Sequence, residues 1–318
     1  MLIITNRNIN FQNFNNGVGN ENGFGDHVNA KGPNEIRLAH AERDGEHWKV
    51  SLVNEPNNLK ASNLPSRRIF DQIRDRLIET RRNALFFVHG FNQSFVKNLE
   101  KAQRIEDLHG VEVIVFSWPS NPGGFPTSEY RQARRHAQAS VSALDATLEK
   151  LGQYLKEPFS KQELQRCGVK LSFMAYSLGN FLFQSYVSGT SYDDETNVFE
   201  NIILCQADVD NEGHRLWVDK IQAGKRVYVT INENDYVLKW SDTNFQKDRL
   251  GRSATKLNAR AAIYFDFTNG AKVERTHEMF AVRENESVRS FFTEVLNGRR
   301  AERNTSMKFD DRINCYRF

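Results

Sequence analysis

The segment Ala175-Tyr176-Ser177-Leu178-Gly179 contains the serine best suited to act as a nucleophile. An apolar run precedes it at 171–174 and a second apolar segment follows at 180–186, which predicts a sharp turn between a strand and a helix. A serine on such a turn has strained backbone and an exposed hydroxyl. Its flanking positions must be small, as Ala175 and Gly179 are, although the strict motif has glycine at both. The competing interpretation is a buried serine beside a helix start.

A serine hydroxyl is a poor nucleophile near neutral pH and needs a histidine base, which a carboxylate must orient. Ser177, Asp235 and His277 occur in an order known for such triads, and each follows an apolar run of strand type. Because the carboxyl ends of parallel strands meet at one edge of a sheet, we expect these three side chains to converge. Asp210, which follows another apolar run, is the alternative acid.

Acyl transfer also needs two backbone N–H groups that stabilise a negatively charged oxygen. One expected donor is Leu178, directly after the serine, and the other is Phe91, which follows an apolar run at 84–88. Gly90 lets the backbone turn there, and His89 is expected to hydrogen-bond within this loop rather than act as the base. The residues expected to line a substrate pocket are His89, Asn92, Trp118 and Tyr176.

Apolar runs alternate with amphipathic segments from residue 65 onward, without a linker or an internal repeat. This alternation predicts an α/β fold with a mostly parallel sheet and helices packed against it. The predicted strands are residues 84–88, 111–116, 171–174, 201–205, 226–231 and 262–267. The predicted helices include one that starts at Asn63-Leu64-Pro65, with Asn63 as its cap, and others at 95–105, 129–155 and 288–296.

The first 62 residues have a different character. Residues 2–5 resemble a strand, and residues 35–40 and 47–53 are predicted to form a hairpin that turns at 43–45. Residues 8–32 are rich in Asn and Gly and are predicted to be a long mobile loop. We expect residues 1–298 to form a single domain and residues 299–318 to be a loosely held polar tail.

Composition excludes several classes of function. The net charge of the 318 residues is only +3, so no nucleic-acid partner is expected. The three cysteines are scattered, and neither metal-ligand spacing nor a phosphate-binding loop in its strand–helix context is present, so no metal or cofactor is expected. No segment reads as a signal peptide or a membrane span, which favours a cytoplasmic location.

Three segments together resemble α/β-hydrolases, and more narrowly a bacterial α/β-hydrolase group without an assigned function. The segments are His89-Gly90-Phe91-Asn92-Gln93-Ser94-Phe95, Phe116-Ser117-Trp118-Pro119-Ser120 and Ala175-Tyr176-Ser177-Leu178-Gly179-Asn180. Further residues in the group's pattern are Thr5-Asn6-Arg7, Tyr130, Arg134, Ala137 and Ser140. The resemblance implies a roughly eight-stranded, mostly parallel sheet with helices on both faces. It also implies Ser177 as nucleophile, Asp235 as acid and His277 as base.

The sequence departs from this pattern at two positions. Tyr176 stands where relatives usually have His, and Ala133 stands where they often have Asp. Neither change removes a member of the triad. The function expected is therefore a serine hydrolase that cleaves a small or lipid-like ester or thioester through an acyl-enzyme. The alternative is a hydrolase-fold binding or signalling module with little turnover, which Tyr176 and the unusual N-terminal segment favour.

Overall fold

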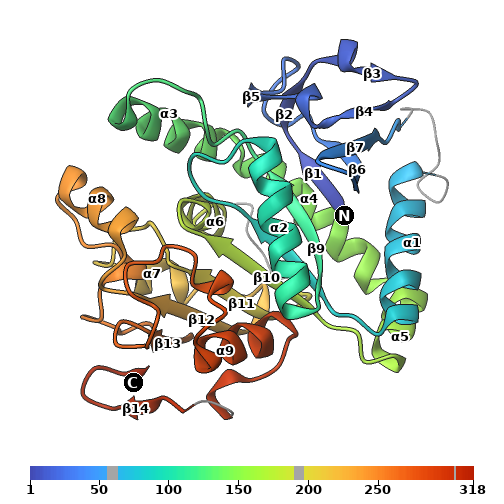
Figure 1. The fold of residues 1–318 in the computed structure, drawn as a ribbon. Coiled ribbons are helices and arrows are strands. Elements are labelled where there is room, and N and C mark those ends of the chain that lie inside the picture. The colour runs from blue at the N-terminus through green and yellow to red at the C-terminus, as the bar shows by residue number, and fades with distance from the viewer. Residues whose placement is uncertain (56–63, 190–196, 304–305) are drawn as a thin grey trace.

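The chain forms one large, mostly parallel sheet with helices on both faces (Figure 1). The structure is a computed structural model that describes residues 1–55, 64–189, 197–303 and 306–318. Strands lie in the order β14-β15-β13-β12-β11-β10-β8-β9-β1-β6-β7-β4-β3. They are β1 (Leu2–Thr5), β3 (Phe14–Asn15), β4 (Val18–Asn20), β6 (Arg37–Asp44), β7 (His47–Leu52), β8 (Ala84–Val88), β9 (Glu112–Ser117), β10 (Leu171–Tyr176), β11 (Phe199–Cys205), β12 (Gly224–Ile231), β13 (Ala262–Asp266), β14 (Lys308–Asp310) and β15 (Cys315–Arg317).

Seven successive parallel pairings join eight strands from β1 through β15. The α/β fold class predicted from the sequence is therefore correct, but the whole sheet has 13 strands rather than about eight. The additional strands pair antiparallel at the two edges: β6, β7, β4 and β3 beyond β1, and β14 beyond β15. Hairpins can extend an edge in this way because an edge strand has unpaired N–H and C=O groups.

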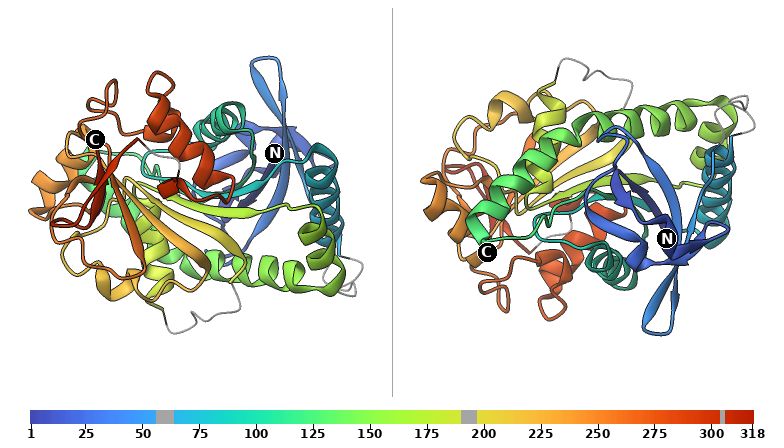
Figure 2. Two further views of the ribbon diagram at one scale, coloured as in Figure 1. Left: turned by 90° about the horizontal axis from the view of Figure 1, so that it is seen from below. Right: turned by 90° about the horizontal axis from the view of Figure 1, so that it is seen from above.

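The central strands carry continuous apolar runs because helices cover both faces, and β8 is apolar along its whole length. In β8, Ala84, Phe86 and Val88 pack into the core on one face, while Leu85 and Phe87 pack on the other. Figure 2 shows α2 and α9 on one side of the sheet and α4 on the other. The helices are α1 (Pro65–Thr80), α2 (Phe95–His109), α3 (Pro126–Ala139), α4 (Val141–Lys156), α5 (Pro158–Arg166), α6 (Gly179–Val187), α7 (Arg215–Val218), α8 (Tyr236–Phe245) and α9 (Glu286–Leu296).

Residues 8–32 are not the long mobile loop that their composition predicted. They contain β3, β4 and the short strands β2 (Arg7–Ile9) and β5 (Phe24–Val28), which pair with each other. Two 3-10 turns connect these strands, and the side chains of Asn10 and Asn20 accept a backbone N–H at the start of each turn. The asparagines therefore hold tight turns in place, since their side chains replace backbone hydrogen bonds. The predicted hairpin is also present as β6 and β7, with its turn at 45–46.

The long helix predicted at 129–155 is two helices, α3 and α4, which meet at Ser140. The Ser140 hydroxyl donates to the His136 carbonyl (2.7 Å) and accepts from Asn6 Nδ2 (2.9 Å). Serine side chains that bond the carbonyl four residues earlier compete with the helical backbone and bend helices. The break thus depends on Asn6, which is 134 positions away in the chain.

The start of α1 and the C-terminal segment can also be compared with the sequence-based expectations. Pro65 is the first residue of α1, as predicted, whereas the expected cap Asn63 lies outside the described residues. The C-terminal segment is not a loose tail, because β15 pairs with β13 and Cys315 is fully buried. Within the described part of the chain, no helix is long and apolar enough to cross a membrane.

Candidate active site

Ser177 lies on the turn between β10 and α6, with its backbone in the left-handed region (φ 53°). Its N–H donates to the Cys205 carbonyl (3.0 Å) and its carbonyl accepts from the Asp208 N–H (3.1 Å). A Cβ atom at Gly179 would lie 2.6 Å from the carbonyl oxygens of Val88 and His89. A glycine is therefore required at position 179, because α6 begins directly against the end of β8.

The side chains of Ser177, His277 and Asp235 form a continuous hydrogen-bonded chain. His277 Nε2 lies 2.8 Å from Ser177 Oγ, and His277 Nδ1 lies 2.6 Å from Asp235 Oδ2. Asp235 is fully buried, and Ser177 is 3% exposed. A carboxylate oxygen can only accept here, so Nδ1 carries the proton and Nε2 is the free acceptor that faces the serine hydroxyl.

Asp235 is held by donors from several directions. Its Oδ1 accepts from the N–H groups of Val237 and Leu238 (3.0 Å each) at the start of α8, and its Oδ2 accepts from Gln206 Nε2 (2.5 Å) as well as from His277. A buried carboxylate is tolerated when hydrogen bonds of this kind replace its water shell. The same bonds hold Oδ2 in place against the imidazole.

The loop formed by residues 89–93, here called the His-Gly loop, packs directly against Ser177. A Cβ atom at Gly90 would lie 2.7 Å from Ser177 Cβ, so only glycine permits this approach. His89 Nε2 accepts from the Trp118 N–H (3.1 Å), and His89 Nδ1 lies 3.0 Å from the Gly90 carbonyl, to which it must donate. Burial, followed by the charge of Arg7, lowers the pKa of His89 well below its ordinary value, so this histidine stays neutral.

This hydrogen bond also orients the Phe91 N–H. In a trans peptide the C=O and N–H point in opposite directions. Because His89 holds the Gly90 carbonyl, the N–H of the same peptide unit, which belongs to Phe91, points away from His89.

The other residues predicted to line a pocket lie in different environments. His89 and Trp118 are fully buried, and their rings stack on each other with centroids 5.4 Å apart. Tyr176 is also buried and contacts the His277 ring, with centroids 5.1 Å apart. Asn92 is exposed and has a positive φ of 53°. Three of the four predicted lining residues, His89, Trp118 and Tyr176, are therefore buried, whereas Asn92 is exposed to solvent.

The two aspartates that follow β11 do not contact His277. Asp210 accepts from Arg249 Nη1 and Lys247 Nζ (2.6 Å each). Asp208 accepts from the hydroxyls of Tyr130 and Ser241 (2.8 Å each). Both carboxylates are therefore engaged in contacts of their own, and Asp235 is the acid that lies against the imidazole.

Sequence reasoning missed Gln206, which ties three parts of the site together. Its Nε2 donates to Asp235 and to the Thr276 carbonyl (2.9 Å), and its Oε1 accepts from the Met279 N–H (2.9 Å). The loop that carries His277 is thereby fixed on both sides of the imidazole. A signal was present, since Gln206 directly follows an apolar strand, as Ser177 does.

Lys101 was also missed. It is almost fully buried on α2, pairs with Glu278, and lies 4.8 Å from the centre of the Tyr176 ring. Burial, the largest single influence, would raise the pKa of Glu278, but the charge and hydrogen bond of Lys101, together with the charge of Arg104, bring that pKa below its ordinary value. Its position on the buried face of an amphipathic helix is the signal that sequence offers, because unpaired lysines avoid such positions.

Arg7 belongs to the family pattern noted in the sequence, but no role was predicted for it. Its guanidinium is fully buried and donates to the Gln93 carbonyl (2.6 Å), Ser117 Oγ (3.0 Å) and Asn121 Oδ1 (3.2 Å). Burial lowers its pKa to about 10, so it remains charged at neutral pH. Arg7 thus connects the N-terminal segment to the His-Gly loop.

In the described residues, no group of three or more His, Cys, Asp or Glu side chains could hold a metal ion.

Comparison with known proteins supports the same fold. Residues 68–277 match the model of a family described as "Alpha/beta hydrolase of unknown function (DUF900)". No curated protein and no solved structure matches the chain. The family match covers more than half of the chain and spans both Ser177 and His277. The chain therefore belongs to this α/β-hydrolase family.

Proposed function

We propose that the protein is a serine hydrolase that cleaves an ester or thioester through an acyl-enzyme. The observation that carries this proposal is the hydrogen-bonded chain from Ser177 through His277 to Asp235. Each of the three residues comes from a loop at the carboxyl ends of the parallel strands. Family membership supports hydrolase chemistry in general.

In the proposed reaction, Ser177 Oγ attacks the acyl carbonyl carbon as His277 Nε2 takes its proton. The tetrahedral intermediate collapses, and His277 returns that proton to the departing alcohol or thiol, which leaves the acyl group on Ser177. Water then attacks this acyl-enzyme with His277 again as base, and the carboxylic acid is released. Asp235 keeps the imidazole in the required tautomer and stabilises the imidazolium in both halves.

Two backbone N–H groups are proposed to hold the negative oxygen of each tetrahedral intermediate. The first is Leu178, which lies at the N-terminal end of α6, where the helix dipole favours negative charge. The second is Phe91, whose N–H points away from the His89 side of the loop. Removing one such donor typically slows turnover by ~10²–10³.

The first test is Ser177→Ala, assayed with short p-nitrophenyl esters. Turnover should fall by at least about 10³-fold. The melting temperature should change little, because the substitution removes one hydroxyl and keeps the backbone able to turn. Ser185→Ala is a matched control, since that serine lies on α6 and its hydroxyl donates to the Phe181 carbonyl. Full activity in Ser177→Ala would reject the proposed nucleophile.

The alternative is a hydrolase scaffold used for binding with little turnover. The observation that favours it is the low exposure of Ser177, 3%, which leaves little room for a substrate carbonyl. A fluorophosphonate probe separates the two functions, because it labels only a serine that a base activates. Labelling of the intact protein, lost in Ser177→Ala, supports the hydrolase. No labelling of the intact protein supports the binding module.

A further inference from the structure

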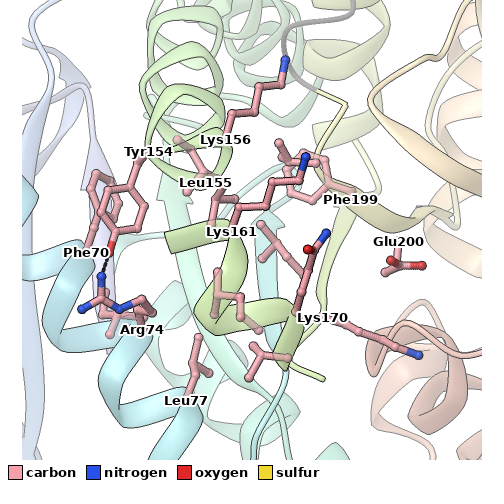
Figure 3. A pocket seen from close by; sticks show the side chains of 18 of the residues that line it. Phe70, Arg74, Leu77, Tyr154, Leu155, Lys156, Lys161, Lys170, Phe199 and Glu200 are labelled. Carbon is pink, nitrogen blue, oxygen red and sulfur yellow. Dashed lines mark hydrogen bonds between the residues drawn. The ribbon is translucent and has the colours of Figure 1, made fainter. Parts of the chain in front are cut away.

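A second candidate ligand site lies at the opposite end of the sheet from Ser177. It is a cavity of about 450 Å³, bounded by α1, α4, α5 and the first residues of β8, β10 and β11 (Figure 3). The six residues of β10 separate Leu171, in its wall, from the Ser177 turn, which is roughly 20 Å at ~3.3 Å per residue. The cavity is therefore distinct from the proposed active site.

The interior of this cavity is apolar. Phe70, Leu77 and Leu151 are buried in its wall, whereas Leu155, Val169 and Leu171 are only partly buried and pack at the edge of the core. Its volume falls in the range of roughly 300–1,000 Å³ that is typical of small-molecule sites. A hydrocarbon chain placed here would cover apolar surface that the protein itself leaves partly exposed.

The rim of the cavity is cationic. Arg74, Lys156, Lys161, Lys170 and Lys225 contribute to the lining, and the only carboxylate among the described residues of the lining is Glu200. Five positive charges and one negative charge thus surround one cavity, whereas the net charge of the whole chain is only +3. In Figure 3 the labelled lysines lie around the apolar side chains.

Some of these charges are already neutralised. Arg74 is paired with Asp71 and Asp75, and Lys225 is paired with Glu200. In the described part of the chain, neither Lys161 nor Lys170 forms an ion pair, and Lys170 Nζ only approaches the Gly298 carbonyl (3.4 Å). Among the described residues, both ammonium groups are therefore without a carboxylate partner, although Lys170 extends outward from the apolar side chains in Figure 3 and must turn to reach a ligand inside.

We propose that this cavity binds an amphipathic carboxylate, with its hydrocarbon chain inside and its carboxylate at Lys161 and Lys170. An apolar interior beside unpaired ammonium groups matches both parts of such a molecule. A neutral alcohol would leave the two charges unpaired, and a cationic amphiphile would be repelled by them. A short carboxylate such as acetate would gain nothing from the apolar interior.

The test is the binding of decanoate below its critical micelle concentration, measured by calorimetry on the full chain. Affinity should rise by roughly fourfold for each added methylene from hexanoate to decanoate, as long as each methylene is buried. Decanol and decyltrimethylammonium should bind at least fivefold more weakly than decanoate, because they lack the negative charge.

Charge reversal locates the site. Lys161→Glu and Lys170→Glu should each weaken decanoate binding by about fivefold, and the double variant by more. Hydrolysis of p-nitrophenyl esters should not change, because both residues are remote from Ser177. Lys220→Glu is the matched control, since Lys220 is an exposed lysine outside the cavity. Equal binding by the double variant and the control would overturn the proposal, as would tighter binding of decanol or decyltrimethylammonium than of decanoate.

Discussion

The two ends of the parallel sheet use buried polar side chains in different ways. At the carboxyl ends, Ser177, His277 and Asp235 bond to one another in a chain, and backbone groups together with Gln206 hold Asp235 in place. These contacts align the lone pair of His277 Nε2 with the hydroxyl proton of Ser177.

At the amino ends, buried polar side chains bond mainly to backbone groups. Asn201 donates to the carbonyls of Val295 and Arg299 (2.8 Å each), and Ser172 also donates to Val295 (3.1 Å). These carbonyls lie at and just beyond the C-terminal end of α9, where the helix leaves its last acceptors unpaired. The two ends therefore differ in what their buried polar side chains connect: at the carboxyl ends a chain of side-chain hydrogen bonds links three loops, whereas at the amino ends Asn201 and Ser172 tie strands to the end of a helix.

The largest expected effect is that of Asp235→Asn, which should lower kcat on a p-nitrophenyl ester by ~10⁴-fold. Asparagine keeps an oxygen that can accept from Val237 and Leu238, so the cap of α8 is preserved. It cannot keep the charge that orients His277. Stability to urea should therefore change by less than about 1 kcal/mol. A kcat within tenfold of the parent would mean that the carboxyl end is structural after all.

Gly90→Ala should have the next largest effect. The added methyl group would lie 2.7 Å from Ser177 Cβ and 3.1 Å from the Tyr176 carbonyl, so the His-Gly loop must shift away from the serine. We expect kcat to fall by ~10²–10³, as when one oxyanion donor is lost. Gly45→Ala is the control for strain alone, because a Cβ there meets nothing within 4 Å and the cost of its positive φ of 61° falls on the turn between β6 and β7. Its kcat should be unchanged even if its stability falls. If Gly90→Ala retained full kcat, the Phe91 N–H would not be the oxyanion donor.

Asn201→Ala should show the smallest effect on catalysis and should act on stability alone. The substitution leaves two carbonyls and the Arg226 Nε group, which donates to Asn201 Oδ1 (2.6 Å), without this partner. Urea denaturation should show a loss of about 2 kcal/mol, since buried polar groups are left unsatisfied. The kcat of the folded enzyme should stay within twofold of the parent. A large loss of kcat at unchanged stability would remove the distinction between the two ends of the sheet.

Local patterns were sufficient for the central strands and for the positions of Ser177 and Asp235 after two of them. The apolar runs before Ser177 and Asp235 correspond to β10 and β12, and carboxyl-end polar residues are brought together by parallel pairing itself. Local patterns could not choose between Asp235 and Asp210, because both follow apolar strands. That choice depends on which loop reaches His277, and loop paths are set by contacts with other elements.

Other features escaped prediction because their causes lie far away in the chain. The break at Ser140 depends on Asn6, and the order of residues 308–317 depends on the free edge of β13. Lys101 is buried on α2 because Glu278, 177 positions later, neutralises it. From the sequence alone, Lys101 is a charged residue on the apolar face of a helix, and its burial cannot be predicted without knowing that Glu278 lies beside it.

The sequence by itself determined the alternation of strands and helices and the small residues that let α6 begin beside β8, because both follow from side-chain size and apolar periodicity over a few positions. Only the tertiary structure decided which carboxylate faces the imidazole, how His89 turns the Gly90 peptide, and where a cationic rim surrounds an apolar cavity. Those features require groups from distant segments to lie within hydrogen-bonding or packing distance. Distances of that kind exist only once the sheet and its two helical layers have assembled.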